Sequence, residues 1–261
     1  MRILWVGNSY TYMPQALGGI PGVVSLLAEL QGEADTPEHT TVTQGGVSLV
    51  ELVERFEAAV REGPEEGFDA VVLQDQSLTP AGGVWGPHQR PFAAREASEE
   101  ALRRRYAPVL RELQKLHGTR VLLYQTWGRP AEMHGQADVL GDFEAMGERL
   151  VEGYARYARA LEEEGVATPP PEAVPCGEAY LRLGRSDAGT LLPQLYSDAI
   201  GHPTPLAALL VGVAFLRALW RRGPHAGVTA RAARQLGLDP AVAATACAGA
   251  GLAEAEEAGT P

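Results

Sequence analysis

The sequence has little positive charge, and almost none of it comes from lysine. Lys115 is the only lysine, and 22 basic residues stand against 33 acidic ones, which gives a formal net charge of −11 over 261 residues. Proteins that bind nucleic acid gain affinity when Lys and Arg replace the counterions of phosphates, and an anionic membrane would repel this chain for the same reason. The composition therefore favours a small or neutral molecule as partner.

Cysteine is almost absent as well. Cys176 and Cys247 are the only two, and no metal-ligand spacing relates them. A single disulfide is possible, but we expect two reduced, buried thiols. No cofactor and no metal site are predicted.

Long apolar segments are also lacking. The longest, residues 206–220, is shorter than the roughly 20 residues that a membrane-spanning helix needs. The first apolar run, residues 3–6, is too short for a signal peptide and is followed at once by a Gly-Asn turn. We therefore expect a cytoplasmic protein.

What the sequence does contain is an alternation of short apolar runs and amphipathic helical patterns, typical of a parallel sheet covered by helices. The candidate strands are residues 3–6, 41–43, 70–73, 121–124 and 173–175. Several of them are continuously apolar, as strands buried on both faces are. This pattern predicts an α/β, flavodoxin-like three-layer sandwich around a parallel sheet of about five strands.

Capping signals and helical periodicity mark the main helices, which we expect at residues 49–60, 96–116, 143–164 and 205–220. Ser48 and Glu51 form a capping box before the first of these. Thr204 is a suitable N-cap for the last, since proline follows it. Pro108 lies inside the second, so a kink or break is expected there.

No repeat or linker separates two domains. We predict one domain over residues 1–225 and an Ala-rich helical extension over residues 226–261, packed on the same domain. Asp239 and Pro240 restart a helix within the extension. The extension could pack over the sheet or form a homodimer.

The first candidate site segment is residues 7–11 (Gly-Asn-Ser-Tyr-Thr), directly after the first strand. Ser9 is thereby placed at the carboxyl edge of the sheet, where ligands bind in open parallel sheets. The alternative is that Ser9 only caps a helix or satisfies a turn. A phosphate loop is not supported because no Gly-Lys-Ser/Thr follows, and Thr11 breaks the Gly-x-Ser-x-Gly pattern of a nucleophile elbow.

The second candidate segment is residues 196–204 (Tyr-Ser-Asp-Ala-Ile-Gly-His-Pro-Thr). Asp198 and His202 lie close together there, just before a capped helix. Such a pair can supply a general base and the carboxylate that orients it. The alternative is a surface turn with an incidental histidine.

Together these segments resemble the SGNH (GDSL-like) hydrolase superfamily. Its nucleophilic serine lies in a turn after the first strand, and its Asp and His share a short C-terminal segment. Residues 45–49 (Gly-Gly-Val-Ser-Leu) and 73–77 (Leu-Gln-Asp-Gln-Ser) are similar to further motifs of a branch with a Gly-Asn-Ser-Tyr-Thr turn. The resemblance covers most of residues 1–220.

The resemblance implies a serine ester hydrolase that works through an acyl-enzyme, with Ser9 as nucleophile, His202 as base and Asp198 as orienting carboxylate. A short-chain ester or an O-acetylated carbohydrate is the expected substrate. The superfamily usually has two residues between Asp and His, whereas this chain has three. Asp187 or a backbone carbonyl is therefore an alternative partner for His202. An acyltransferase with the same residues, or a non-catalytic domain that binds a small molecule or glycan, is the alternative function.

The resemblance also implies an oxyanion hole formed by the backbone N–H groups of Ser9 and Gly46 with the side-chain amide of Gln76. Gly45 and Gln74 are second candidates for the last two positions and would in any case line the substrate site. The alternative for Gln76 is an amide that only structures its loop.

Aromatic residues complete the expected substrate site. Trp85 and Trp127 fall on loops that should border the crevice, and Tyr10 follows Ser9 directly. Rings there could stack on a sugar or hold an acyl group. The alternative is that they anchor the loops as buried hydrophobic groups.

Overall fold

The computed structural model describes residues 1–34, 36–84, 93–186 and 189–253. The chain divides into two compact units. Unit 1 comprises Met1–Thr11 and Glu38–Gly177, and unit 2 comprises Tyr12–Pro37 and Glu178–Pro261. The boundary that we predicted at residue 225 does not coincide with a boundary between these units.

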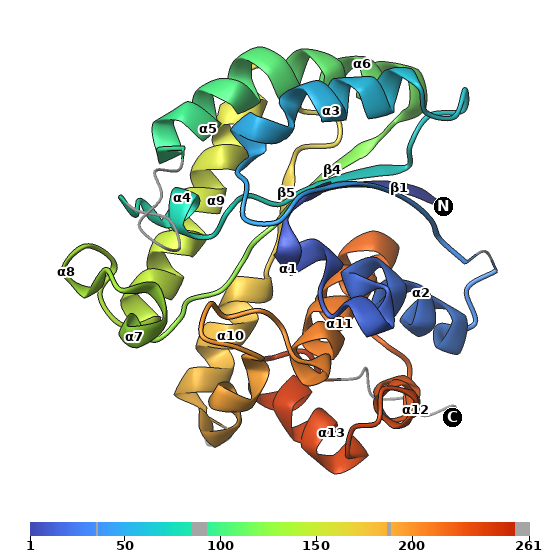
Figure 1. Cartoon of the computed structure of the whole chain (residues 1–261). Coiled ribbons are helices and arrows are strands. Elements are labelled where there is room, and N and C mark those ends of the chain that lie inside the picture. Colours follow the sequence, from blue (N-terminus) through green and yellow to red (C-terminus); the bar gives the residue numbers. More distant parts are fainter. Residues whose placement is uncertain (35, 85–92, 187–188, 254–261) are drawn as a thin grey trace. The chain divides into compact units, whose positions relative to one another are not determined.

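Unit 1 contains a five-stranded sheet (Figure 1). Its strands are β1 (Arg2–Gly7), β2 (Glu38–Thr43), β3 (Ala70–Leu73), β4 (Arg120–Tyr124) and β5 (Glu172–Val174). Every neighbouring pair is parallel, and the strand order is β2-β1-β3-β4-β5. This order is that of flavodoxin-like folds. The predicted parallel sheet is confirmed, although β2 starts earlier than its apolar residues indicated because this edge strand is largely exposed.

The helices of unit 1 are α3 (Leu49–Arg61), α4 (Leu78–Ala81), α5 (Arg95–Ala101), α6 (Ala107–His117), α7 (Ala131–His134), α8 (Ala137–Leu140) and α9 (Phe143–Glu163). The capping box of Ser48 and Glu51 forms as predicted. The helix expected over residues 96–116 is interrupted by a π-helical segment, Leu102–Tyr106, just before Pro108. A wider turn there avoids the clash between a proline ring and the carbonyl four residues earlier.

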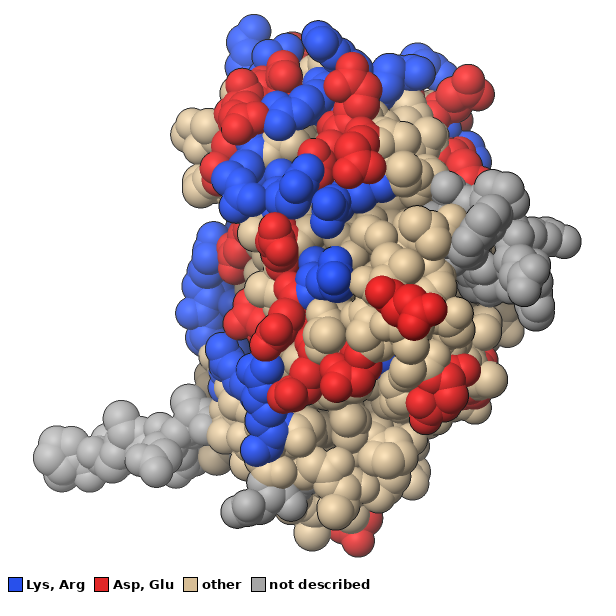
Figure 2. Space-filling view, turned by 90° about the vertical axis from the view of Figure 1, so that its left-hand side faces the viewer, with Lys and Arg blue, Asp and Glu red and all other residues tan. Residues whose placement is uncertain are grey.

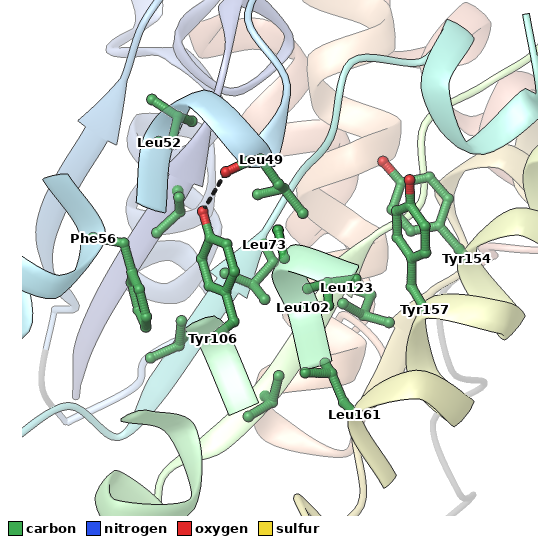
Figure 3. Close-up of a cluster of buried hydrophobic side chains, with 14 of the residues drawn as sticks. Leu49, Leu52, Phe56, Leu73, Leu102, Tyr106, Leu123, Tyr154, Tyr157 and Leu161 are labelled. Atoms are coloured by element: carbon green, nitrogen blue, oxygen red, sulfur yellow. Dashed lines mark hydrogen bonds between the residues drawn. The ribbon is translucent and has the colours of Figure 1, made fainter. Parts of the chain in front are cut away.

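The core of unit 1 lies between the sheet and helices α3, α5, α6 and α9 (Figure 1). Alternate strand residues such as Leu4, Leu73 and Leu123 contribute to it, and Figure 3 shows part of this cluster. Strand residues of the opposite parity, such as Trp5 and Val72, are buried as well. The continuous apolar runs thus correspond to strands buried on both faces.

Unit 2 is helical where the structure describes it. Its elements are η1 (Gln15–Leu17), α2 (Gly19–Gln31), η4 (Gly189–Leu195), α11 (Pro205–Trp220), α12 (Val228–Gln235) and α13 (Pro240–Gly249). Helix α11 packs on α2, and Gly212 permits the approach because a Cβ there would lie 2.7 Å from Val23 Cγ1. Two further helices, α1 (Ser9–Tyr12) and α10 (Cys176–Arg185), cross from one unit into the other along the chain.

The Ala-rich segment forms α12 and α13, as its sequence predicted, and α12 packs on α2 within unit 2. Arg231 anchors it there by donating a 2.8 Å hydrogen bond from a guanidinium nitrogen to the Leu30 carbonyl. Cys176 and Cys247 are free and buried, as expected. Among the described helices, none has the length and apolar character that crossing a membrane requires.

The surface charges of both signs are interspersed. On the face shown in Figure 2, Lys and Arg side chains alternate with Asp and Glu side chains. Ion pairs join opposite charges in unit 1, for example Arg156 with Glu99 at 2.6 Å and Arg105 with Glu57 at 3.0 Å. The negative net charge is therefore not collected into one acidic area on this face.

Candidate active site

The sequence-predicted nucleophile and oxyanion donors follow three neighbouring strands. In the register of the sheet, Gly7 of β1 pairs with Thr43 of β2, and Val6 pairs with Leu73 of β3. Neighbouring strands lie about 4.8 Å apart, and the carboxyl ends of parallel strands share one edge. Ser9 therefore follows the middle strand at this edge, while the Gly45–Gly46 and Gln76 segments follow the strands on either side.

Asn8 fixes the turn that carries Ser9. Its backbone N–H donates to Gln74 Oε1 at 2.8 Å, and its side-chain Nδ2 donates to the Val47 carbonyl at 3.0 Å. Its Oδ1 accepts the Tyr10 N–H at 3.1 Å, at the start of α1. Asn8 thus ties the turn to the segments after β2 and β3, and leaves Ser9 half-buried at the first position of a short helix.

Gly7 and Gln74 explain the tight packing behind this turn. A Cβ on Gly7 would lie 2.5 Å from Thr11 Oγ1 and 2.6 Å from Gln74 Oε1, so a larger residue would force these side chains or the turn to shift. The amide of Gln74 makes three hydrogen bonds: Oε1 accepts from Asn8 N–H and from Thr11 Oγ1 at 3.0 Å, and Nε2 donates to the Asp75 carbonyl. In this arrangement Gln74 holds the nucleophile turn.

Gln76 differs from Gln74 in which atoms of its side-chain amide are bonded. Its Oε1 accepts the Leu78 N–H at 2.5 Å, which fixes which end of the amide carries oxygen. Its Nε2 donates to no group in the described parts of the chain, although the residue is only 6% exposed. An oriented amide with an unused N–H pair at the sheet edge has the chemistry of an oxyanion donor.

The loop with Gly45 and Gly46 leads into helix α3. Both glycines are exposed, and Gly46 has a φ of +73°, a conformation that favours glycine. The N–H of Gly46 has no hydrogen-bond partner within the described ranges. The far end of the loop is fixed, because Val47 accepts from Asn8 and Leu49 donates to Asp75.

Asp75 is a buried carboxylate to which sequence reasoning assigned no role. Its Oδ1 accepts the backbone N–H groups of Leu49 at 2.9 Å and Gln76 at 2.7 Å, and its Oδ2 accepts the Tyr157 hydroxyl at 2.8 Å. Burial raises the pKa of Asp75, and these hydrogen bonds, that from Leu49 first, act in the opposite direction. The signal in the sequence was a charged residue two positions after a wholly apolar strand.

Two of the predicted substrate-binding residues, Tyr10 and Trp127, pack against each other. Trp127 is fully buried and stacks on Tyr10, with ring centroids 4.7 Å apart and planes 8° from parallel. The Tyr124 hydroxyl donates to the Tyr10 carbonyl at 3.3 Å. These buried rings anchor the nucleophile turn, and that Tyr10 and Trp127 also contact substrate stays a prediction. Trp85 lies outside the described residues.

In unit 2, Asp198 contacts His202 directly. Asp198 Oδ2 lies 2.5 Å from His202 Nδ1, and Oδ1 accepts the N–H groups of Ile200 and His202 at 3.1 Å each. Partial burial alone would raise the pKa of Asp198, but the hydrogen bonds from His202 and Ile200 outweigh it and lower the pKa. Asp187, the alternative partner, lies outside the described residues.

The loop that holds this pair closes on itself. Tyr196 and Pro203 form an antiparallel bridge, and the His202 carbonyl accepts the Ser197 N–H at 2.8 Å. Gly201, at a φ of +82°, donates its N–H to the Asp198 carbonyl at 3.1 Å. This left-handed glycine accommodates the extra residue between Asp198 and His202.

No metal site is evident in the described residues, where no group of three His, Cys, Asp or Glu side chains could hold an ion.

No protein-family model and no curated protein matches this sequence. Solved structures do resemble it. A DUF4886 family protein from Bacteroides uniformis is 15% identical, with a TM-score of 0.59 over 96% of this chain and 93% of that one. A candidate SGNH hydrolase from Slackia heliotrinireducens is 23% identical, with a TM-score of 0.53 over 84% and 98% of the two chains. The chain has the fold of the SGNH hydrolases.

An acetyl xylan esterase, AlAXEase, is also similar to this SGNH fold, with 17% identity and a TM-score of 0.52 over 84% of this chain and all of that one. At these identities the likeness shows the fold. The fold class predicted from the sequence is thereby confirmed, and so is the suspected resemblance to SGNH hydrolases.

Proposed function

We propose that this protein is a serine ester hydrolase in which Ser9 forms an acyl-enzyme and His202 is the general base. The observation that carries this proposal is the 2.5 Å contact between Asp198 Oδ2 and His202 Nδ1. An ionised carboxylate only accepts hydrogen bonds, so the Nδ1 atom that it contacts carries the proton. The other ring nitrogen, Nε2, then has the lone pair that a base requires.

The proposed reaction proceeds in two stages. His202 Nε2 removes the proton of Ser9 Oγ as that oxygen attacks the ester carbonyl carbon, and His202 then gives the proton to the departing alcohol. Water, deprotonated by the same histidine, attacks the acyl-enzyme, and Ser9 leaves with the proton returned to it. Asp198 keeps the imidazole oriented and stabilises its cation in both stages.

The negative charge of each tetrahedral intermediate requires donors. We assign these to the backbone N–H groups of Ser9 and Gly46 and to Gln76 Nε2. The unused donors of Gln76 support this choice over Gln74, whose Nε2 is held by the Asp75 carbonyl and whose Oε1 is held by Asn8. Each such donor is worth about 10²–10³ in turnover.

For substrate, we propose a short-chain ester or an O-acetylated carbohydrate. A formal net charge of −11 disfavours polyanionic substrates. One protein with a similar fold is an acetyl xylan esterase, which supports an acetylated sugar. An acyltransferase would share every step up to the acyl-enzyme and differ only in using another alcohol in place of water.

Labelling with a fluorophosphonate, followed by mass spectrometry of the peptides, tests this proposal. We expect one adduct at Ser9 and turnover of p-nitrophenyl acetate in the wild type. His202→Ala should slow both by about 10²–10⁴-fold, the usual contribution of a general base. His225→Ala, which removes another histidine of unit 2, is the matched control and should label normally.

An unlabelled, inactive wild type with a normal circular dichroism spectrum would contradict the proposal and favour a binding domain. Product analysis with added sugar or alcohol separates the remaining two cases, since only a transferase forms a new ester.

A further inference from the structure

We propose that Asp75 is a positioning residue that holds the two oxyanion donors outside the nucleophile turn, Gly46 and Gln76, in place. This inference rests on the proposed function and adds to it a residue that does not touch the substrate. The Asp75 carboxylate accepts three hydrogen bonds, from the Leu49 N–H, the Gln76 N–H and the Tyr157 hydroxyl, and these three donors carry the inference.

One carboxylate oxygen holds both donor segments. Oδ1 accepts the N–H of Gln76 itself at 2.7 Å and the N–H of Leu49 at 2.9 Å. Leu49 is the first residue of α3 and lies three positions after Gly46. The segment after β2 and the segment after β3 are therefore held at a fixed distance from each other by one shared acceptor, Asp75 Oδ1. A shift of this oxygen would move both segments.

The second oxygen anchors the carboxylate to helix α9. Oδ2 accepts the Tyr157 hydroxyl at 2.8 Å, and the hydroxyl of Tyr154 accepts the Asp75 N–H at 3.3 Å. In Figure 3 the two tyrosines extend from α9 with their hydroxyls pointing the same way. Burial and the neighbouring carboxylate hold the pKa of Tyr157 well above its ordinary range, so its hydroxyl keeps its proton and donates.

A third tyrosine, Tyr106, fixes Leu49, the first residue of α3. The Tyr106 hydroxyl donates to the Leu49 carbonyl at 2.8 Å (Figure 3). Leu49 is thus held at its N–H by Asp75 and at its carbonyl by Tyr106, while the preceding glycines remain exposed. Because Leu49 is fixed at both its N–H and its carbonyl, the exposed loop before it can hold the Gly46 N–H in one direction. Preorganised oxyanion stabilisation requires donors that are fixed in this way.

Hydrogen bonds to a charged acceptor are about twice as strong as neutral ones. Asp75→Asn is therefore the informative change: it keeps the side chain's size and one carbonyl oxygen, but removes the charge. The matched control is Thr119→Val. Thr119 is fully buried and donates to the Phe68 carbonyl at 2.6 Å, but it precedes β4, at the sheet edge opposite to the donors.

We would measure kcat and KM for p-nitrophenyl acetate, and amide hydrogen exchange in residues 45–49 and 74–78. For Asp75→Asn we expect kcat to fall about 10–100-fold, less than the loss of a whole donor. KM should stay within about threefold, because the donors act in the transition state. Exchange should quicken at Leu49 and Gln76. Thr119→Val should change neither measurement, even with an equal drop in melting temperature.

Wild-type kcat in Asp75→Asn, an equal loss of kcat in Thr119→Val, or a loss that appears only in KM would each overturn the inference. A wild-type protein that neither labels at Ser9 nor hydrolyses the ester removes the proposed function and this inference with it. An active wild type with an unaffected Asp75→Asn variant removes the inference alone.

Discussion

The nucleophile turn (residues 7–11) and the acid–base loop (residues 196–204) are built in different ways. Asn8, in the turn, bonds with residues 39 and 66 positions away, and these contacts are buried. In the loop, the bonds from Asp198 to His202 span four positions and that from Ser197 to His202 spans five, and all are exposed. These bonds tie the turn to distant segments of unit 1, whereas the bonds named in the loop join residues close in sequence.

This contrast determines what a mutation can do in each region. A change beneath the nucleophile turn must alter packing and catalysis together, because the same contacts serve both. A change in the acid–base loop can alter catalysis without much effect on stability, since exposed ion pairs contribute little, about 0–1 kcal/mol. Three substitutions test the contrast.

Asp198→Asn should have the largest effect. Asparagine can present an N–H to His202 Nδ1 and so select the wrong tautomer, which costs about 10⁴-fold where this has been tested in a serine protease. We expect kcat to fall about 10²–10⁴-fold, with the melting temperature nearly unchanged. Steady-state kinetics and a thermal melt check this, and an active Asp198→Asn variant would contradict the role of Asp198.

The charge of Asp198 gives this prediction a pH dependence. Because His202 and Ile200 lower its pKa in the folded protein, the interaction stabilises the fold above the unfolded pKa and is lost as pH falls through the folded pKa. A carboxyl ¹³C titration should give a midpoint below the ordinary 3.8. In His202→Ala the midpoint should return toward that value, and an unchanged midpoint would show that His202 is not the cause.

The same contrast explains what the sequence could predict. Asp198, His202 and the Thr204 cap lie within seven residues, so their joint arrangement could be inferred from spacing and capping preferences. The strands and most helices were likewise predictable from apolar periodicity. The difference between Gln74 and Gln76 was not, because it depends on contacts with Asn8 and Leu78 that form only after β1 and β3 pair.

The contacts of buried aromatic residues were as hard to predict as those of Gln74 and Gln76. Tyr154 and Tyr157 fall at helical spacing within the helix predicted for residues 143–164, but periodicity does not report where a hydroxyl points. Trp127 follows a strand at the expected edge, yet its ring is buried and stacks on that of Tyr10. Tertiary packing decides between these outcomes, and one sequence does not encode it locally.

Gly7→Ala should have the second largest effect, on both stability and rate. Its Cβ would meet Thr11 and Gln74 at 2.5–2.6 Å, so the turn must shift. We expect a loss of about 1–3 kcal/mol, as for other overpacked sites. A displacement of Ser9 by about 1 Å should lower kcat roughly 10²-fold. Urea unfolding and ester kinetics on the same samples measure both.

Gly118→Ala is the control for this change. Gly118 caps α6 at a φ of +69° with nothing within 4 Å of its Cβ, so strain of about 1 kcal/mol is expected without any effect on kcat. Full activity in Gly7→Ala would show that the turn tolerates a shift and is not held as tightly as its contacts indicate.

Thr204→Ala should have the smallest effect on rate, although it too destabilises the protein. Thr204 Oγ1 accepts the Ala207 N–H at 3.2 Å and donates to the Gln194 carbonyl at 2.8 Å, and the loss of such a cap costs about 0.5–2 kcal/mol. The bonds between Asp198 and His202 do not involve this hydroxyl, so kcat at 25 °C should stay within about twofold. Thr204→Ser, which keeps the hydroxyl, should restore stability. If Thr204→Ala instead lost as much activity as Gly7→Ala for the same loss of stability, the acid–base loop would depend on the helix behind it, and its independence from the surrounding fold would be disproved.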